Sequence, residues 1–171
     1  GRRSKPIVAN VPALSASGDN VYIRNLWKAT TVVGAIHAGG ALVLDVAGSV
    51  TGDGANVPTI SAQDATIRAG GDIGSALNPL DTNIGNLHGG ARNAFIDNHS
   101  PLLNVTDLDV RNNLQIATDG DIIGRRITAK NITVIAAGNV GTAKTPFTFW
   151  ASGRVKILAG LYILNYRNLY R

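Results

Sequence analysis

The chain has 171 residues, with 16 Lys and Arg against 11 acidic residues, 44% hydrophobic residues, and neither Cys nor Met. This length and apolar content suit one folded domain and exclude a disordered polyelectrolyte. The lack of Cys excludes disulfides and thiolate metal sites, and no apolar run reaches the ~18 residues that a membrane span needs.

The residue types favour strands and turns over helices. All 11 acidic residues are Asp, none is Glu, and the chain holds 20 glycines. Asp and Gly are typical of turns, whereas Glu favours helices, and no long stretch keeps a helical apolar period. The sequence therefore predicts an all-β protein. The missing Met leads us to expect a piece of a longer product.

In chain order, residues 1–28 predict an extended segment leading into the fold, or its first coil. Residues 29–171 repeat one pattern, in which alternating apolar residues lead into a glycine. The clearest copies, 64–80 and 131–147, are offset by 67 residues without a gap. Successive copies start about 20–25 residues apart, or about twice that where a loop intervenes, a period typical of solenoids.

Stacking such coils would bury their apolar faces against one another, because a single coil cannot bury its face alone. The sequence thus predicts a parallel β-helix (β-solenoid) of about seven coils with inward apolar ladders. A sandwich or barrel is the alternative, and it would need hairpin turns. The expected ladder residues include Leu44, Ile67, Ile116, Val134 and Ile157.

Two segments depart from this pattern. Residues 78–104 are rich in Gly, Asn, Asp and Pro and predict a loop excursion, as wide turns or a protruding loop. Residues 147–171 are aromatic and basic, and Tyr, Trp and Arg dominate interface hot spots. We expect an assembly interface there, with a cap folded over the last coil as the alternative. The expected interface residues are Phe147, Phe149, Trp150, Arg154, Tyr162, Tyr166, Arg167 and Tyr170.

Three stretches carry a family resemblance: AGGDIGSALNPL at 69–80, AGNVGTAKTPF at 137–147 and GAIHAGGALVLDV at 34–46. They resemble the repeats of very large bacterial surface proteins, the filamentous-haemagglutinin-like and leukotoxin-like filamentous adhesins. The resemblance spans about residues 30–165. It implies a right-handed β-helix, export across the envelope, an extracellular or cell-surface location, and a role in adhesion or in a surface fibre. The family has no catalytic motif to carry over in this region.

Parallel β-helices also host polysaccharide lyases and glycoside hydrolases, which need clustered carboxylates or Asp with Arg or Lys. Paired carboxylates about 5–10 Å apart could serve. Outward Asp on a strand is also the ordinary solvated face, and Asp beside Gly is turn chemistry. We therefore expect no enzymatic activity. The candidate pairs are Asp107 with Asp109 and Asp119 with Asp121.

The three histidines are far apart in sequence and lack acidic or Cys companions at ligand spacing. We expect structural or loop roles for them, with no metal and no cofactor. The histidines are His37, His88 and His99.

Charge is segregated along the chain, with net +4 over residues 1–28, −7 over 29–124 and +8 over 125–171. In a solenoid, sequence position is axial position, so the pattern predicts a rod with basic ends and an acidic middle. The basic residues spread over several coils without a nucleic-acid module. We therefore favour contact with another copy, a neighbouring solenoid domain or a surface glycan over nucleic acid.

The leading hypothesis is a structural segment or subunit of a bacterial extracellular fibre or filamentous adhesin. The alternatives are a carbohydrate-active β-helix enzyme and a glycan-binding module. Three or more carboxyl and basic side chains in one lateral groove would favour the enzyme. A smooth lateral face with open ends would favour the fibre.

Overall fold

The computed structural model describes residues 5–54, 58–164 and 166–169, and all regular structure among them is β-strand. No helix in this part of the chain is long and apolar enough to cross a membrane. The strands are β1 (Ile7–Ala9), β2 (Ala13–Gly18), β3 (Val21–Asn25), β4 (Thr31–Ala38), β5 (Ala41–Val46), β6 (Val50–Gly52), β7 (Ile60–Ala69), β8 (Leu80–Ala91), β9 (Ala94–Asn98), β10 (Leu102–Val110), β11 (Asn113–Thr118), β12 (Asp121–Ala129), β13 (Asn131–Ala136), β14 (Phe147–Ala151), β15 (Val155–Ala159) and β16 (Tyr166–Asn168).

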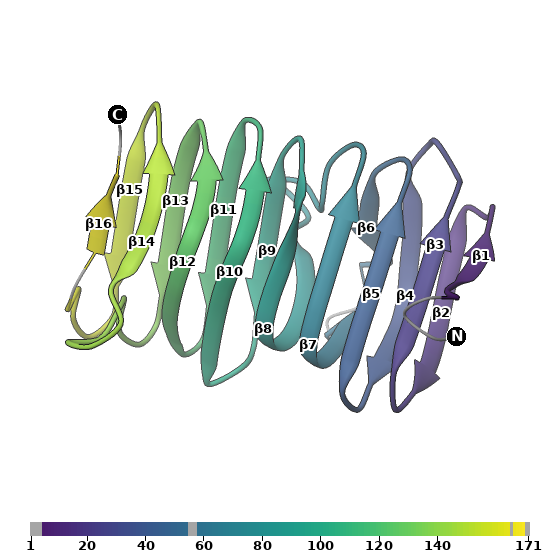
Figure 1. Ribbon diagram of the computed structural model, residues 1–171, viewed down its shortest axis with the longest axis horizontal. Coiled ribbons are helices and arrows are strands. Elements are labelled where there is room, and N and C mark those ends of the chain that lie inside the picture. The colour runs from purple at the N-terminus through teal and green to yellow at the C-terminus, as the bar shows by residue number, and fades with distance from the viewer. Residues whose placement is uncertain (1–4, 55–57, 165, 170–171) are drawn as a thin grey trace.

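The strands wind into a β-solenoid of about eight turns, one more than the sequence suggested. In Figure 1 the strands nearest the viewer point up, those behind point down, and turns succeed one another from right to left. This winding is right-handed, as parallel crossovers almost always are. Every strand pair that the structure describes is parallel, so the hairpin-built sandwich or barrel is excluded.

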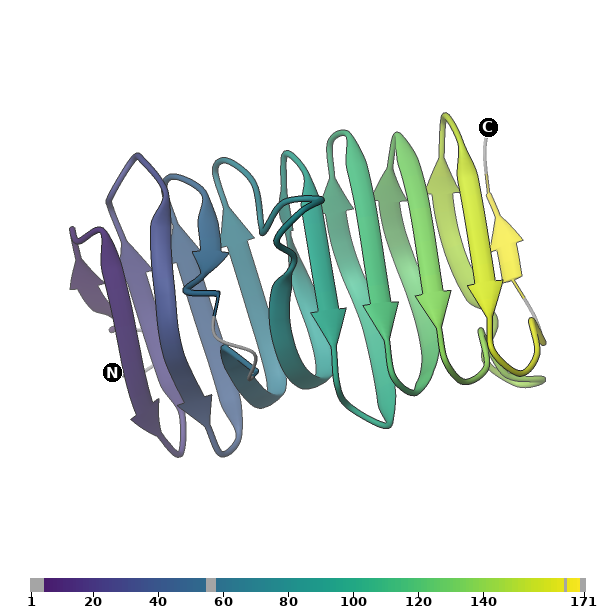
Figure 2. The same cartoon turned by 180° about the vertical axis from the view of Figure 1, so that it is seen from behind.

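The solenoid has two broad faces. Face 1 follows the order β1-β3-β5-β7-β8-β10-β12-β14-β16. Face 2, seen from the front in Figure 2, runs from β2 and β4 through β6 and the first halves of β7 and β8 to β9, β11, β13 and β15. Turn length varies from 16 residues between Ile7 and Ile23 to 24 between Ile36 and Ile60.

The interior consists of the predicted apolar ladders. Leu44, Ile67, Ile116 and Val134 are fully buried, and Ile157 near the C-terminal end is partly buried. These side chains face inward because alternate residues of each strand point to one side, and each fully buried one contributes about 1.5–3 kcal/mol. The predicted ladder is therefore confirmed.

Residues 78–104, expected to be a loop excursion, instead form β8, β9 and the start of β10. The glycines that suggested turns lie inside β8. At Gly89, with φ of 138°, an added Cβ would stand 1.8 Å from the Ile67 carbonyl oxygen of the previous turn. Glycine is thus required both by this backbone conformation and by close packing between strands, and not by a turn. Residues 5–28 likewise belong to the first turns, as β1 to β3.

The two copies of the 67-residue repeat share a turn but lie on opposite faces. Ser75 N–H donates to the Asn78 carbonyl at 2.9 Å, and Thr142 N–H donates to the Thr145 carbonyl at 2.8 Å. The glycine before each turn has a positive φ, 60° in the first and 73° in the second. The strands that precede these turns are β7 on face 1 and β13 on face 2. The repeat therefore marks the same local turn at opposite corners of the solenoid, about three and a half turns apart.

A ladder of polar side chains runs along one corner. Asn93 donates from its backbone N and Nδ2 to Asp72 Oδ1 at 3.1 and 2.9 Å, and Asn113 bonds Asn93 Oδ1 in the same way at 3.2 and 3.0 Å. Asn131 Nδ2 donates to Asn113 Oδ1 at 2.9 Å, and Arg154 N–H donates to Asn131 Oδ1 at 2.9 Å. Successive turns are thus held in register by side chains as well as by strands.

Candidate functional site

The expected C-terminal interface contains two residues that are not on the surface. Phe147 and Phe149 are fully buried in β14, with ring centroids 5.8 Å apart. Phe149 pairs with Ile127 of the previous turn on an inward ladder. The prediction is wrong for these two rings, because alternation along β14 turns both into the core.

The other expected interface residues lie outside the core. Tyr162 is 68% exposed and Tyr166 is 52% exposed, while Trp150 is half-buried. Arg154 and Arg167 are exposed, and Tyr170 lies outside the described residues. The Tyr166 ring stacks on Phe149 with centroids 6.3 Å apart and planes 4° apart. This end therefore combines exposed aromatic and basic side chains.

Apolar side chains and open strand edges surround these aromatics. The structure pairs β15 only with β13 and β16 only with β14 among the described strands. A hollow of about 350 Å³ opens beside them, lined by Val155, Ile157 and Tyr166 among others. The exposed apolar residues here are Leu158, Leu161, Ile163, Leu164 and Leu169.

The N-terminal end is open in the same way. Strand β1 pairs with β3 and β2 pairs with β4, each on one side only within the described chain. Ile7 and Val8 of β1 are 55% and 61% exposed. Both ends therefore present parallel strand edges with uncovered apolar side chains.

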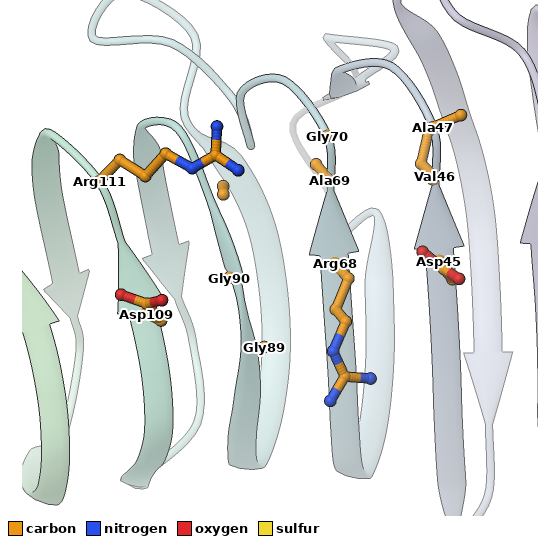
Figure 3. Close-up of a pocket in the computed structure, with 11 residues that line it drawn as sticks. Asp45, Val46, Ala47, Arg68, Ala69, Gly70, Gly89, Gly90, Asp109 and Arg111 are labelled. Carbon is orange, nitrogen blue, oxygen red and sulfur yellow. The ribbon is translucent and has the colours of Figure 1, made fainter.

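A groove crosses face 1 in the middle of the rod (Figure 3). It has a volume of about 420 Å³ and is lined by two carboxylates and two guanidinium groups over a floor of adjacent glycines. In Figure 3 the Arg111 side chain extends from the end of β10 over β8, while Arg68 lies along β7. The charged lining residues are Asp45, Arg68, Asp109 and Arg111.

The spacing of the two carboxylates in this groove does not suit glycoside hydrolysis. Asp45 pairs with Arg68, Arg68 with Gly90, and Gly90 with Asp109, so the two carboxylates lie three strands apart. Three strand spacings amount to roughly 14 Å, whereas paired catalytic carboxyls stand about 5–10 Å apart. The groove therefore meets the criterion of three or more carboxyl and basic side chains that would favour an enzyme, but the separation of its two carboxylates does not match that of a glycosidase pair.

Three of the carboxylates considered for catalysis have partners within the fold. Asp107 forms a two-pronged ion pair with Arg126, at 2.5 and 2.6 Å. Asp121 Oδ1 accepts hydrogen bonds from the backbone N and Nδ2 of Asn139 at 2.7 and 3.1 Å. Asp119 bonds His99 at 2.7 Å. Each of these bonds links neighbouring turns.

The expectation that His99 lacks acidic companions is wrong, because stacking of turns places Asp81 and Asp119 beside it, in addition to Asp97 two residues earlier in the sequence. His99 Nδ1 lies 2.7 Å from Asp119 Oδ2, and Nε2 lies 3.8 Å from Asp81 Oδ1. Donor atoms of Asp81, Asp97 and His99 all lie within 4.8 Å of one another. We call Asp81, Asp97, His99 and Asp119 the His99 corner. Asp81 and Asp97 are 16 residues apart, and His99 and Asp119 are 20 residues apart. These separations match the turn length, so the sequence could have predicted that the residues meet.

The carboxylates change the protonation of the imidazole. The hydrogen bond with Asp119 raises the pKa of His99 above its usual value, and partial burial opposes this shift. The charges of Asp119, Asp97 and Asp81 raise the same pKa further. The ring is therefore easier to protonate than a free histidine.

The other two histidines stand outside such a cluster. His37 is exposed on β4, and His88 is half-buried on β8 with Nδ1 2.8 Å from Thr106 Oγ1. Among the described residues, the group that combines three metal-binding side chains is Asp81, Asp97 and His99.

Comparison of the chain with protein-family models, curated proteins and solved structures gives no match. The β-solenoid fold that the adhesin resemblance implies is confirmed by the structure itself.

Proposed function

We propose that this chain is a structural rod segment of a bacterial extracellular fibre or filamentous adhesin, which joins further solenoid coils through its ends. The observation that carries the proposal is the pair of open ends. Strand edges with exposed apolar side chains stand at β1 and β2 and again at β15 and β16. Free edges of this kind are templates for pairing with another strand.

The geometry of the ends suits axial growth. All strand pairs within the described rod are parallel, so a further coil added to β15 and β16 can continue both faces with the same hydrogen-bond pattern. The exposed Ile163 and Tyr166, which are in register with the buried Val140 and Phe147, would then be covered as the inner residues of the rod are. Natural repeat proteins close such ends with polar caps, and these ends are apolar.

The charge distribution gives the proposal a salt dependence. Both terminal segments are basic, +4 over residues 1–28 and +8 over 125–171. End-to-end contact between copies opposes like charges, so salt screening strengthens it. Contact between a basic end and the acidic middle of a neighbour would instead weaken with salt.

Sedimentation velocity over a range of protein and salt concentrations tests the proposal, with negative-stain imaging of the same samples. We expect end-to-end rods whose association increases with salt, and loss of association in Ile163→Lys and Tyr166→Lys. Leu77→Lys is the matched control, because Leu77 is fully exposed at 100% on a turn away from both ends. A chain that stays monomeric at millimolar concentration would refute the assembly role.

The groove on face 1 favours a second candidate function, the binding of a charged saccharide. No ion pair or hydrogen bond of the described chain engages the side chains of Arg68, Asp109 or Arg111, which leaves them available to a ligand. Arg presents a planar fork that matches carboxylates. We expect Arg68→Ala and Arg111→Ala to reduce retention on uronate-containing polysaccharides, with no new reducing ends or unsaturated products released. Cleavage that disappears in Asp109→Asn would establish an enzyme instead.

A further inference from the structure

The His99 corner places like charges side by side without a Lys or Arg partner. Asp81 and Asp97 occupy directly paired positions on β8 and β9 of neighbouring turns. Like charges directly opposite one another destabilise a strand pair. Within the described chain, neither they nor Asp119 form an ion pair with Lys or Arg. The corner thus gathers three carboxylates around one imidazole.

The backbone beneath these side chains is fixed by a buried polar network. Asn98 lies between Asp97 and His99 in sequence and is fully buried. Its Oδ1 accepts from Thr82 Oγ1 and from Ile84 N–H, both at 2.9 Å, and its Nδ2 donates to Ser100. Since Asn98 points inward, its two neighbours point outward together, over the turn that carries Asp81.

The imidazole is oriented by the third carboxylate. With Nδ1–H donated to Asp119 at 2.7 Å, the Nε2 lone pair is free and lies on the side of Asp81, 3.8 Å away. A histidine that binds a metal through one ring nitrogen usually donates the N–H of the other nitrogen to a carboxylate, which fixes the orientation of the ring. Asp119 is thus a positioning residue, and Nε2 is the atom whose lone pair can bind a metal ion.

We propose that the His99 corner binds a divalent transition-metal cation, with zinc as the ion to test. The ligands would be His99 Nε2 and one carboxylate oxygen each from Asp81 and Asp97. Nε2 lies 3.8 Å from Asp81 Oδ1, and one ligand atom from each of the three residues already lies within 4.8 Å of the others. Zinc bonds of about 2.0–2.2 Å bring ligand atoms to roughly 3.3 Å apart. A small rotation of partly exposed side chains supplies that closure. An imidazole ligand favours zinc over calcium, which takes oxygen ligands.

The metal would join two successive turns of the rod. Asp81 belongs to one turn, while Asp97 and His99 belong to the next. Bound cation would replace the repulsion between paired carboxylates by attraction to one centre, and it would stabilise the folded chain by mass action. The site lies on the side of the rod and does not depend on the proposed end-to-end assembly.

Zinc titration of the tag-free, chelator-treated chain tests the proposal by isothermal calorimetry, thermal melting and side-chain ¹⁵N NMR. We expect one zinc per chain, a higher melting temperature, and a shift of the His99 Nε2 resonance alone among the three histidines. His99→Gln and Asp97→Asn should abolish these changes, and Asp119→Asn should weaken zinc affinity about tenfold. His37→Gln and Asp109→Asn are controls that should bind zinc like the parent chain.

Circular dichroism of each metal-free variant establishes that it is folded, and the NMR readout on the parent chain is independent of any variant. Absence of a His99 shift at saturating zinc would overturn the site. Equal binding of calcium and zinc that survives His99→Gln would also overturn it, since it would reduce the corner to an acidic patch.

Discussion

Shortening one inward side chain gives a quantitative test of the stacked-turn core. Ile116 is fully buried and pairs with Ile96 on one neighbouring turn and Val134 on the other. Ile157 pairs with Val134 but belongs to the edge strand β15 and is only partly buried. Ile→Ala at a buried site costs about 2–5 kcal/mol, including the cavity left behind. We expect about 3–4 kcal/mol for Ile116→Ala and roughly half of that for Ile157→Ala.

Urea denaturation followed by far-ultraviolet circular dichroism measures both values. A loss of about 3–4 kcal/mol lowers the melting temperature by roughly 6–16 °C in a chain of this size. An unchanged dependence of the unfolding free energy on urea concentration shows that the variant exposes as much surface on unfolding as the parent chain. A free-energy loss for Ile157→Ala equal to or larger than that for Ile116→Ala would refute the expectation that the core is more stable in the middle of the rod than at its end.

Ile116→Asp buries an unpaired charge and should prevent folding. Unchanged stability of that variant would refute the stacked core.

The remaining predictions concern packing, register and pH. Gly89→Ala should strongly destabilise the fold, whereas Gly18→Ala, whose added Cβ has no neighbour nearer than 3.7 Å, should change the melting temperature little. Asn113→Ala breaks the exposed polar ladder and should cost about 0.5–1.5 kcal/mol in urea denaturation. The hydrogen bond from Arg92 holds the pKa of Asp72 below its usual value, so this carboxylate stabilises the fold above its unfolded pKa. The stability advantage of the parent over Asp72→Asn should be full at neutral pH and disappear as pH falls below about 4.

The apolar alternation was sufficient to predict the fold class and the ladder. Leu44, Ile67, Ile116 and Val134 each stand in a local strand pattern, and the sequence period brings the next strand alongside. Local pattern and long-range packing agree at these positions. Because of this agreement, a solenoid fold can be predicted from the sequence.

The sequence predicted the wrong role for residues whose surroundings depend on a neighbouring turn. Gly89 is a residue type typical of turns, but its positive φ and its closeness to the Ile67 carbonyl one turn away require glycine within a strand. Phe147 and Phe149 resemble interface aromatics by composition, but their place on inward positions of β14 puts them in the core. His99 has Asp97 nearby in sequence and acquires Asp81 from β8 and Asp119 from the turn after β11. Sequence spacing alone does not give the register that produces these contacts.

The variation in turn length explains where a repetitive rod can carry a specific site. Identical turns would present the same outward residues along the whole axis, and a change in turn length shifts which outward residues of neighbouring turns lie side by side. The 16-residue step from Leu80 to Ile96 is among the shortest in the structure, and it brings Asp81 into register with Asp97. The groove on face 1 arises one segment later in the same strand, where the two glycines of β8 remove side chains between Arg68 and Asp109. Both lateral features therefore come from the segment 78–104, whose composition first marked it as a departure from the repeat.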